Sequence, residues 1–403
     1  MKQLLAYCLS IILCVSFTGC MENYLDLYPE DKITSASFPE NESDIKLLLN
    51  GIYAQLREKE VYNQGLFGFG ITDGATPNAF NWGTDEVFNK LGAGRLSSSD
   101  GGVVTYRWKR CYEIISRVNY LLACMDLVDL SEEAKTMYSG EAHFLRGLAY
   151  SLLAETYGGV PIILTDISTE EARCLKRASL EETWQQALDD YEVAITSLGV
   201  DAPEPGRATK GAALGMKMRA YLYQGKYKEV LSCVEQIDAL KIYGLFHSYE
   251  GLFDPANENN KEVLFDIQYI EGENSQGSYI DQYCGTGTGS WTRGSRYVPT
   301  DDLVEAYETI DGSPVDPENP YENRDPRLGF TAVLPGSYFL GYRFPNYLYP
   351  GGAFNHAGNR LKHLSTRKYR IQDESKLPPS GQSYINDIIL RYADVLLSKA
   401  EAI

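Results

Sequence analysis

The stretch Arg219-Ala-Tyr-Leu-Tyr-Gln-Gly-Lys-Tyr-Lys-Glu-Val230 decides the fold class. It joins two segments with helical periodicity, residues 210–223 and 227–240, at a single break at Gly225. Glycine commonly ends a helix because it adopts left-handed backbone angles without a steric penalty. A short connection of this kind places two helices side by side and antiparallel. The stretch therefore predicts a helical hairpin.

This hairpin resembles a tetratricopeptide unit, whose central turn has a Gly-x-Tyr-x-Glu pattern. Trp184, Ala187 and Tyr191 fit the spacing of the first helix of such a unit, although about ten extra loop residues follow. Helix pairs of this kind stack and bury a shared seam, and small residues such as Gly211 and Gly215 let backbones approach. We therefore predict a mainly all-α fold, a scaffold of tetratricopeptide-like helix pairs with little β structure.

Helical periodicity covers most of residues 44–245, which we predict to be one helical region. Further helices are expected at 44–56, at 106–124, from a Ser131 cap to Gly158, and behind a capping box at Ser179–Glu182. Trp108, Leu180 and Trp184 fall on the apolar faces of these helices and are predicted core residues. The Gly-rich segment 63–105 interrupts the pattern as a long loop insertion.

Beyond the helical region the composition changes. Residues 246–390 are rich in Gly, Pro, Asn and Tyr, and only 262–269 alternates in the way a short strand does. We predict a loop-rich, ligand-binding region here. Residues 391–403 begin a new helix that the end of the sequence interrupts, so we expect the start of a truncated C-terminal helical region.

The N-terminus carries an export signal. Residues 1–19 have a charged start, a short apolar run and small residues before Cys20, which resembles the lipobox of bacterial lipoproteins. Cys20 is then the lipidated N-terminus, residues 20–43 are a polar tether, and the acyl chains hold the protein on a membrane. The alternative is an ordinary secretory signal cut nearby.

The formal net charge of −18 excludes a nucleic-acid partner, because phosphate binding needs a basic face.

No motif predicts catalysis, a metal site or a cofactor. The four His lack metal-ligand spacing, the carboxylate doublets are typical of solvated helix faces, and no nucleophile elbow is present. Gly285-Thr-Gly-Thr-Gly289 lacks the lysine of a phosphate loop. The cysteines beyond the signal have no pairing pattern and are predicted to be buried thiols; they are Cys111, Cys124, Cys174, Cys233 and Cys284.

Two tryptophans, Trp82 and Trp291, lie in Gly-rich loops, where a large indole gains little from packing. Sugar rings present apolar C–H faces that stack on aromatic planes, while carboxylate, amide and guanidinium groups bind the hydroxyls. We therefore predict a carbohydrate site with both indoles as stacking platforms. Its further members are Asp73, Asn81, Tyr283, Arg293 and Arg296. The alternative is that each Trp pins its loop to the body of the protein.

Several blocks, in order along most of the chain, resemble the SusD/RagB family of outer-membrane nutrient-binding lipoproteins. They are Tyr24-Leu-Asp-Leu-Tyr-Pro29, Leu49-Asn-Gly-Ile-Tyr53, Trp108-Lys-Arg-Cys-Tyr-Glu-Ile-Ile115 with Asn119, Glu141-Ala-His-Phe-Leu-Arg-Gly-Leu-Ala-Tyr150, Tyr157-Gly-Gly-Val-Pro161, Gly206-Arg-Ala-Thr-Lys-Gly-Ala-Ala213, Asp311-Gly312, Asn323-Arg-Asp-Pro-Arg-Leu328 and Arg391-Tyr-Ala-Asp-Val-Leu-Leu397.

The resemblance implies a non-enzymatic lipoprotein on the outer membrane at the cell surface, which captures glycans and hands them to a TonB-dependent (SusC-like) transporter. It also implies that the matched charged residues are ion-paired or capping; these are Arg324, Asp325, Arg327, Arg391 and Asp394. Family members usually continue well beyond the Arg391–Leu397 block. Two other functions stay open: a tetratricopeptide-type peptide-binding or scaffold lipoprotein, and a glycoside hydrolase with two carboxylates across a cleft.

Overall fold

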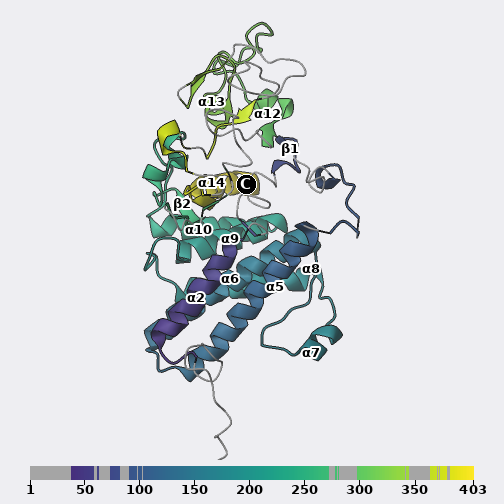
Figure 1. Ribbon diagram of the computed structural model, residues 1–403, viewed down its shortest axis with the longest axis vertical. Helices are drawn as coiled ribbons and strands as arrows, with labels where there is room; N and C mark the ends of the chain where they lie inside the picture. Colours follow the sequence, from purple (N-terminus) through teal and green to yellow (C-terminus); the bar gives the residue numbers. More distant parts are fainter. Residues whose placement is uncertain are drawn as a thin grey trace, which may run out of the picture.

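A computed structural model of the chain describes residues 38–58, 61–62, 73–81, 90–97, 99–101, 103–271, 277–278, 280, 297–340, 342–344, 364–369, 371, 373–378 and 382–403. The long helices gather in one half of the molecule, and most of the short strands lie in the other half (Figure 1). We call these the helical half and the loop-rich half.

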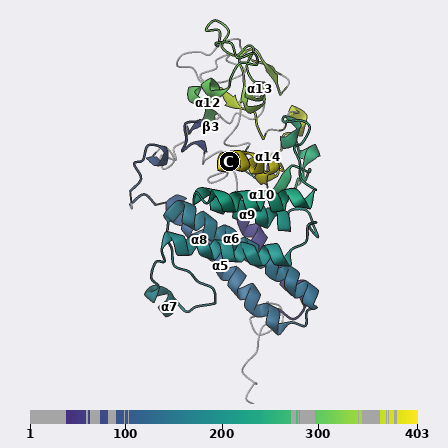
Figure 2. The same cartoon turned by 180° about the vertical axis from the view of Figure 1, so that it is seen from behind.

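The helical half consists of helix pairs. Its main members are α2 (Glu42–Leu56), α5 (Val103–Cys124), α6 (Glu132–Tyr157), α8 (Leu180–Ser197), α9 (Lys210–Tyr223) and α10 (Tyr227–Leu240). Helix α6 packs against α5 and α8, and α9 packs against α8 and α10 (Figures 1 and 2). Gly225, between α9 and α10, has a φ of 67°, the left-handed angle that the sequence predicts there. The predicted helix-pair scaffold is confirmed.

The core of this half is centred on α6. Residues of α6 from Gly140 to Ala154 are nearly all buried, because small and apolar side chains surround the helix on every side. Its Phe144 and Tyr150 are among the largest fully buried side chains of the described residues, together with Tyr191 of α8. This cluster holds the helical half together without a disulfide among the described cysteines.

The helix ends follow the predicted caps. Ser131 caps α6, and Ser179 and Glu182 form a complete capping box at α8. The predicted burial of Leu180 is wrong: this side chain is 48% exposed. Leu180 is the first residue of α8, and the buried face of this helix begins only at Thr183 and Trp184, so the periodic pattern extends one turn beyond the packed part of the helix.

The predicted core roles of the other side chains are largely confirmed. Trp184 is buried, and Trp108 is half-buried against the rings of Tyr112 and Tyr157.

Among the cysteines, Cys111, Cys124 and Cys233 are free and buried, whereas Cys174 is exposed, which corrects the prediction. Cys174 ends the short helix α7 (Thr169–Cys174), which has no buried residue and projects from the helical half (Figure 1). Cys284 lies outside the described residues.

A two-stranded sheet connects the halves. The predicted strand is β2 (Val263–Ile267), and it pairs antiparallel with β8 (Asp387–Arg391), which continues directly into α14 (Tyr392–Ala402). A Cβ added to Gly215 of α9 would lie 2.2 Å from Leu390 Cδ2, so this glycine lets the sheet sit against the helix. Helix α14 then packs on α10 and α9.

The rest of the loop-rich half consists of short elements. Three antiparallel pairs are formed by β1 (Ala79–Asn81) with β3 (Tyr297–Pro299), β4 (Ala332–Val333) with β7 (Ser365–Thr366), and β5 (Tyr338–Phe339) with β6 (Tyr342–Arg343). The short helices of this half are η2 (Gly251–Phe253), η3 (Pro255–Asn257), α12 (Asp301–Ala306), α13 (Arg327–Thr331) and η4 (Glu374–Lys376). In the helical half, the short helix η1 (Met125–Leu127) directly follows α5.

Candidate functional site

The β1–β3 pair joins the two segments in which the sequence predicts ligand-binding residues. Asn81 is the register partner of Tyr297, and Ala79 is the partner of Pro299. The Thr300 N–H extends the pair by donating to the carbonyl of Asn78 at 3.1 Å. In the sequence, Trp82 follows Asn81, and Arg296 precedes Tyr297. The pair therefore brings together the ends of two loop segments that are far apart in the chain.

The structure describes only part of the predicted site. Asp73 and the main chain of Asn81 are described. The other predicted residues lie outside the described residues; they are Trp82, Tyr283, Trp291, Arg293 and Arg296, and the predicted lipidation site Cys20. Their roles stay predictions.

Asp73 is half-buried beside a lysine from a distant part of the chain. Burial raises the pKa of Asp73, and the positive charge of Lys368 opposes that rise. Burial lowers the pKa of Lys368 to about 8, with repulsion from Arg391 as a second cause and attraction to Asp73 and Asp387 opposing it. Asp73, which the sequence predicts as a site residue, is thus close enough to Lys368 for their charges to interact, and the sequence does not predict a role for Lys368.

Lys368 also lines a pocket of about 230 Å³, which we call the Lys368 pocket. Phe253, Phe330 and Tyr369 supply aromatic walls, and the Lys368 ammonium nitrogen lies 4.6 Å from the centre of the Phe253 ring. Arg367 lines the pocket too and donates to Glu250 Oε1 at 2.7 Å. Aromatic walls with a few charged groups at the rim suit a polyhydroxylated ligand.

The Lys368 pocket and the β1–β3 pair belong to one region, because β3 packs against β7, which directly precedes Arg367 and Lys368. Sequence reasoning missed the pocket. Phe253 lies in η2, Phe330 in α13 and Lys368 after β7, and no local pattern links these three positions. These residues are recognisable as neighbours only in the folded structure. We take Asp73, the β1–β3 pair and the Lys368 pocket as the candidate site.

The charged residues of the matched blocks are structural, as predicted. Arg324 donates to the carbonyls of Val304 and Tyr307 at the end of α12, and Arg327 pairs with Asp325. Arg391 pairs with Glu262 at 2.7 Å, and Asp394 pairs with Arg219 of α9. The Arg391–Glu262 and Arg219–Asp394 pairs link separate elements, whereas the Arg327–Asp325 pair is local.

The described residues contain no obvious catalytic or metal centre. No group of three or more His, Cys, Asp or Glu side chains within the described ranges could hold a metal ion. His143 Nδ1 lies 2.7 Å from Asp190 Oδ1, but this aspartate is buried and also receives the Arg146 guanidinium.

Within the described ranges, no helix combines the length and apolar character that crossing a bilayer requires.

Two family models match the chain. A model described as starch-binding and associating with the outer membrane matches residues 23–222, and the model of the SusD family matches residues 261–403. The chain belongs to the SusD/RagB family. The first match includes most of the helical half and the second most of the loop-rich half.

SusD-like proteins are also found among curated relatives. One from Formosa agariphila is 26% identical over 321 residues, which are 74% of this chain and 58% of that protein. A second SusD-like protein of the same organism is 23% identical over 288 residues, which are 69% of this chain and 55% of that protein. The chain thus spans less than two thirds of the length of these relatives.

Solved SusD-like structures share the fold. A SusD-like carbohydrate-binding protein from Bacteroides fragilis has a TM-score of 0.78 and 27% identity, covering 90% of this chain and 74% of that chain. A laminarin-binding SusD-like protein has a TM-score of 0.71, covering 90% of this chain and 80% of that chain. Its identity is 19%, so this likeness shows the fold alone.

Proposed function

We propose that this protein is a cell-surface glycan-binding lipoprotein whose ligand binds at the candidate site. The observation that carries the proposal is the register of Asn81 with Tyr297, because it joins the two loop segments that contain Trp82 and Trp291. The names of the SusD-like relatives support the ligand class, since one is called carbohydrate-binding and another laminarin-binding. The aromatic walls of the Lys368 pocket suit the same chemistry.

The proposal includes an anchor and a partner. Cys20 carries the lipid that holds the protein on the outer membrane, and the protein passes its glycan to a TonB-dependent transporter of the SusC type. Binding takes place without catalysis. In support, the description of the matching family model associates the family with the outer membrane.

Retardation in native gels that contain polysaccharides tests the binding. We expect one or more glycans of a panel to retard the protein, and we expect Trp82→Ala combined with Trp291→Ala to abolish that retardation. The matched control is Tyr106→Ala, which removes an exposed ring from the helical half. Unchanged retardation of the double variant would refute the stacking role. Release of sugar from the retained glycan by the purified protein would show an enzyme instead.

Two further experiments test the anchor and the partner. Labelled palmitate should enter the wild-type protein in the cell and fail to enter Cys20→Ala.

A SusC-like transporter should co-purify with the anchored protein from outer membranes. Recovery of a soluble partner without a transporter would favour the peptide-binding scaffold.

A further inference from the structure

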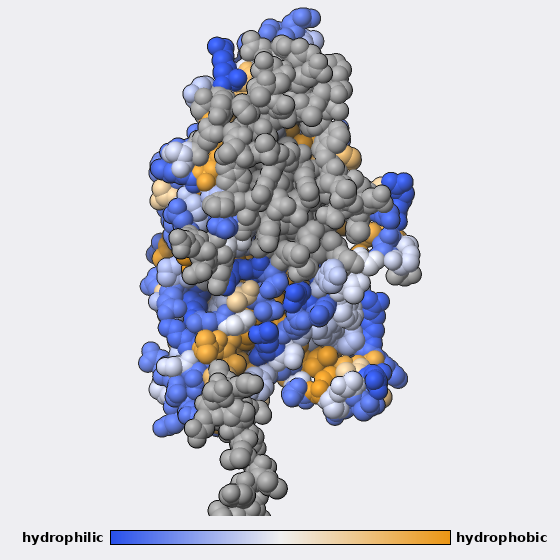
Figure 3. All heavy atoms as spheres, viewed as in Figure 1, coloured by the Kyte–Doolittle hydropathy of each residue, from blue (hydrophilic) through white to orange (hydrophobic). Residues whose placement is uncertain are grey.

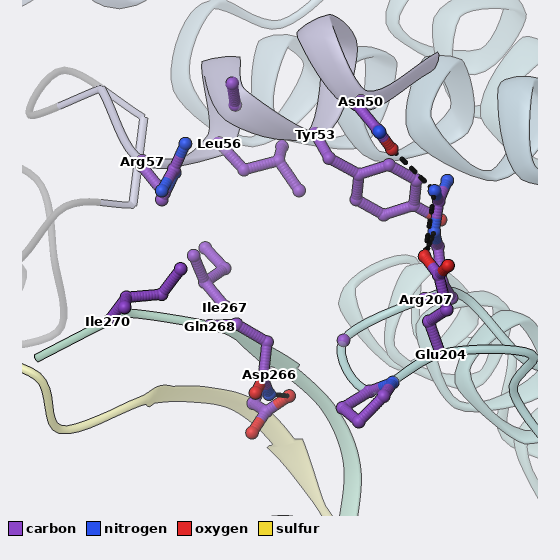
Figure 4. A pocket seen from close by; sticks show the side chains of 13 residues that line it. Asn50, Tyr53, Leu56, Arg57, Glu204, Arg207, Asp266, Ile267, Gln268 and Ile270 are labelled. Carbon is purple, nitrogen blue, oxygen red and sulfur yellow. Dashed lines mark hydrogen bonds and ion pairs between the residues drawn. The ribbon is translucent and has the colours of Figure 1, made fainter. Parts of the chain in front are cut away.

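A second pocket, of about 220 Å³, lies between the helical half and β2. Its walls are the C-terminal end of α2, the turn Glu204–Arg207, and the end of β2 with the residues after it as far as Ile270 (Figure 4). It shares no residue with the Lys368 pocket. A neighbouring hollow of about 350 Å³ is lined by the same turn Glu204–Arg207 and by Asp266. We call the smaller one the Arg57 pocket.

Almost every charge that lines the Arg57 pocket is already paired. Arg207 donates to Glu141 Oε2 at 3.2 Å and to Glu204 Oε2 at 3.3 Å, and it also donates to Asn50 Oδ1 (Figure 4). Glu204 also accepts from Lys46. On the opposite wall, Asp266 accepts from Gln268 Nε2 at 2.7 Å and from an amide nitrogen of Asn386 at 3.1 Å.

Arg57 is the exception. Within the described part of the chain, its guanidinium makes no hydrogen bond and no ion pair, and its neighbour Glu58 pairs with Arg110 at 3.3 Å instead. Figure 4 shows Arg57 across the opening from Ile270. The side chain is half-buried, and burial lowers its pKa. Among the residues that the structure describes, the buried Tyr269 hydroxyl beside it has no hydrogen-bond partner either.

An unpaired, partly desolvated guanidinium is costly, and a carboxylate that accepts two parallel hydrogen bonds offsets that cost best. The wall beside Arg57 is apolar: Leu56 and Ile267 line it, and Ile270 is 62% exposed. The side-chain amides of Asn50 and Gln268 also line this pocket. The ligand should therefore carry one carboxylate, an apolar face and hydroxyl groups, in a body that fits about 220 Å³.

We propose that the Arg57 pocket is a second binding site, specific for a sugar acid of the hexuronate class, with the carboxylate on Arg57 and the ring face on Ile270. This site does not depend on the proposed function of the candidate site, because the two share no residue.

Titration calorimetry of the full chain with sodium glucuronate tests the site, with glucose as the neutral match. We expect saturable glucuronate binding, at least about tenfold weaker in Arg57→Gln, since a hydrogen bond to a charged group has that magnitude. Ile270→Ser, at an exposed position, should also weaken binding. Arg173→Gln, which removes an exposed arginine from α7, should bind as the wild type does.

Three results would overturn the proposal: no glucuronate binding to the wild type, equal binding to Arg57→Gln, or glucose bound as tightly as glucuronate. The Trp82→Ala, Trp291→Ala double variant separates this site from the candidate site. It should keep its affinity for glucuronate, and loss of that affinity would place the sugar acid at the candidate site and refute the second site.

Discussion

Small residues determine where main chains can meet in the helical half. Gly159 follows α6 at a point where the chain passes under the start of α8. A Cβ added there would lie 2.0 Å from the carbonyl oxygen of Ala178 and 2.7 Å from the carbonyl carbon of Ser179. These are main-chain atoms, which cannot rotate out of the way as the end of a side chain can. Only glycine therefore fits at this crossing.

We predict that Gly159→Ala lowers the free energy of unfolding by at least about 2 kcal/mol, because the added methyl group forces α6 and the 178–180 segment apart. Urea unfolding measures the change. Gly101→Ala is the matched control, since a Cβ there meets nothing within 4 Å and it should be nearly neutral. Equal stability of the two variants would contradict this account of the crossing.

At the scale of single residues, the sequence suggests candidate ligand-binding residues only where a side chain is unusual for its surroundings. Trp82 and Trp291 are conspicuous because large indoles are unusual in Gly-rich loops. Phe253 and Lys368 are not, because an aromatic ring in a short helix and a lysine after a strand are ordinary positions. Their importance comes from lying 4.6 Å apart, ring centre to ammonium nitrogen, which no local pattern encodes.

At the scale of elements, a buried charge network joins three helices. Asp190 of α8 accepts from the Arg146 side chain of α6 at 2.8 and 3.0 Å, and His143 lies at 2.7 Å. Arg146 also donates to Asn119 of α5 at 2.9 Å. Asp190 is only 1% exposed, so water cannot replace it. The network fixes the lateral positions of α5, α6 and α8.

We predict that Asp190→Asn destabilises the chain by about 3 kcal/mol, because it leaves the buried Arg146 cation without its counter-charge. The neighbouring change Asp189→Asn affects an exposed side chain that bonds only Gln185 among the described residues, and it should alter stability by less than about 0.5 kcal/mol. Chemical denaturation of both variants gives the comparison. A tolerated Asp190→Asn would mean that the network contributes nothing to helix packing.

The β2–β8 connection should respond to pH. Burial raises the pKa of Asp266 to about 6 and that of Glu258 to about 7, and both accept hydrogen bonds from Asn386, next to β8. Acids with a raised pKa hold protons more firmly in the folded state, so their stabilising effect is complete at low pH and is lost as the pH rises through these values.

We therefore expect the free energy of unfolding to fall by about 1–3 kcal/mol between pH 5 and pH 8. Glu258 is partly exposed, so solvent screening reduces its share of this change. Asp266→Asn combined with Glu258→Gln should flatten the dependence, whereas Asp189→Asn should keep it. Parallel pH profiles for the wild type and the double variant would show that other groups are responsible.

The helices could be predicted because each carries its own signals. The capping box at Ser179 and Glu182 and the left-handed turn at Gly225 are local, and both are present in the structure. Strand β8 could not be predicted, because Asp387–Arg391 is a strand only through its pairing with the distant β2. Leu180 shows one error: periodicity placed it on the buried face, but burial along α8 begins only at Thr183.

At the scale of the whole molecule, the two halves differ in what they can offer a ligand. The visible face of the helical half is mainly hydrophilic, with small separate hydrophobic patches, one of them beside α7 (Figure 3). Some of its charged side chains link neighbouring helices, as in the Asp190 network. The loop-rich half instead has short strands that position loops, and it contains the Lys368 pocket. On this basis we propose that glycan capture takes place in the loop-rich half.

Hydrogen–deuterium exchange, with and without a glycan that the gel panel retains, tests this central claim most directly. The account predicts added protection in residues 73–81, 297–300 and 367–369, which contain Asp73, the β1–β3 pair and Lys368, and no change in α8, α9 and α10. Protection confined to these helices, with none at the β1–β3 pair, would contradict it and would favour ligand binding on the helix pairs.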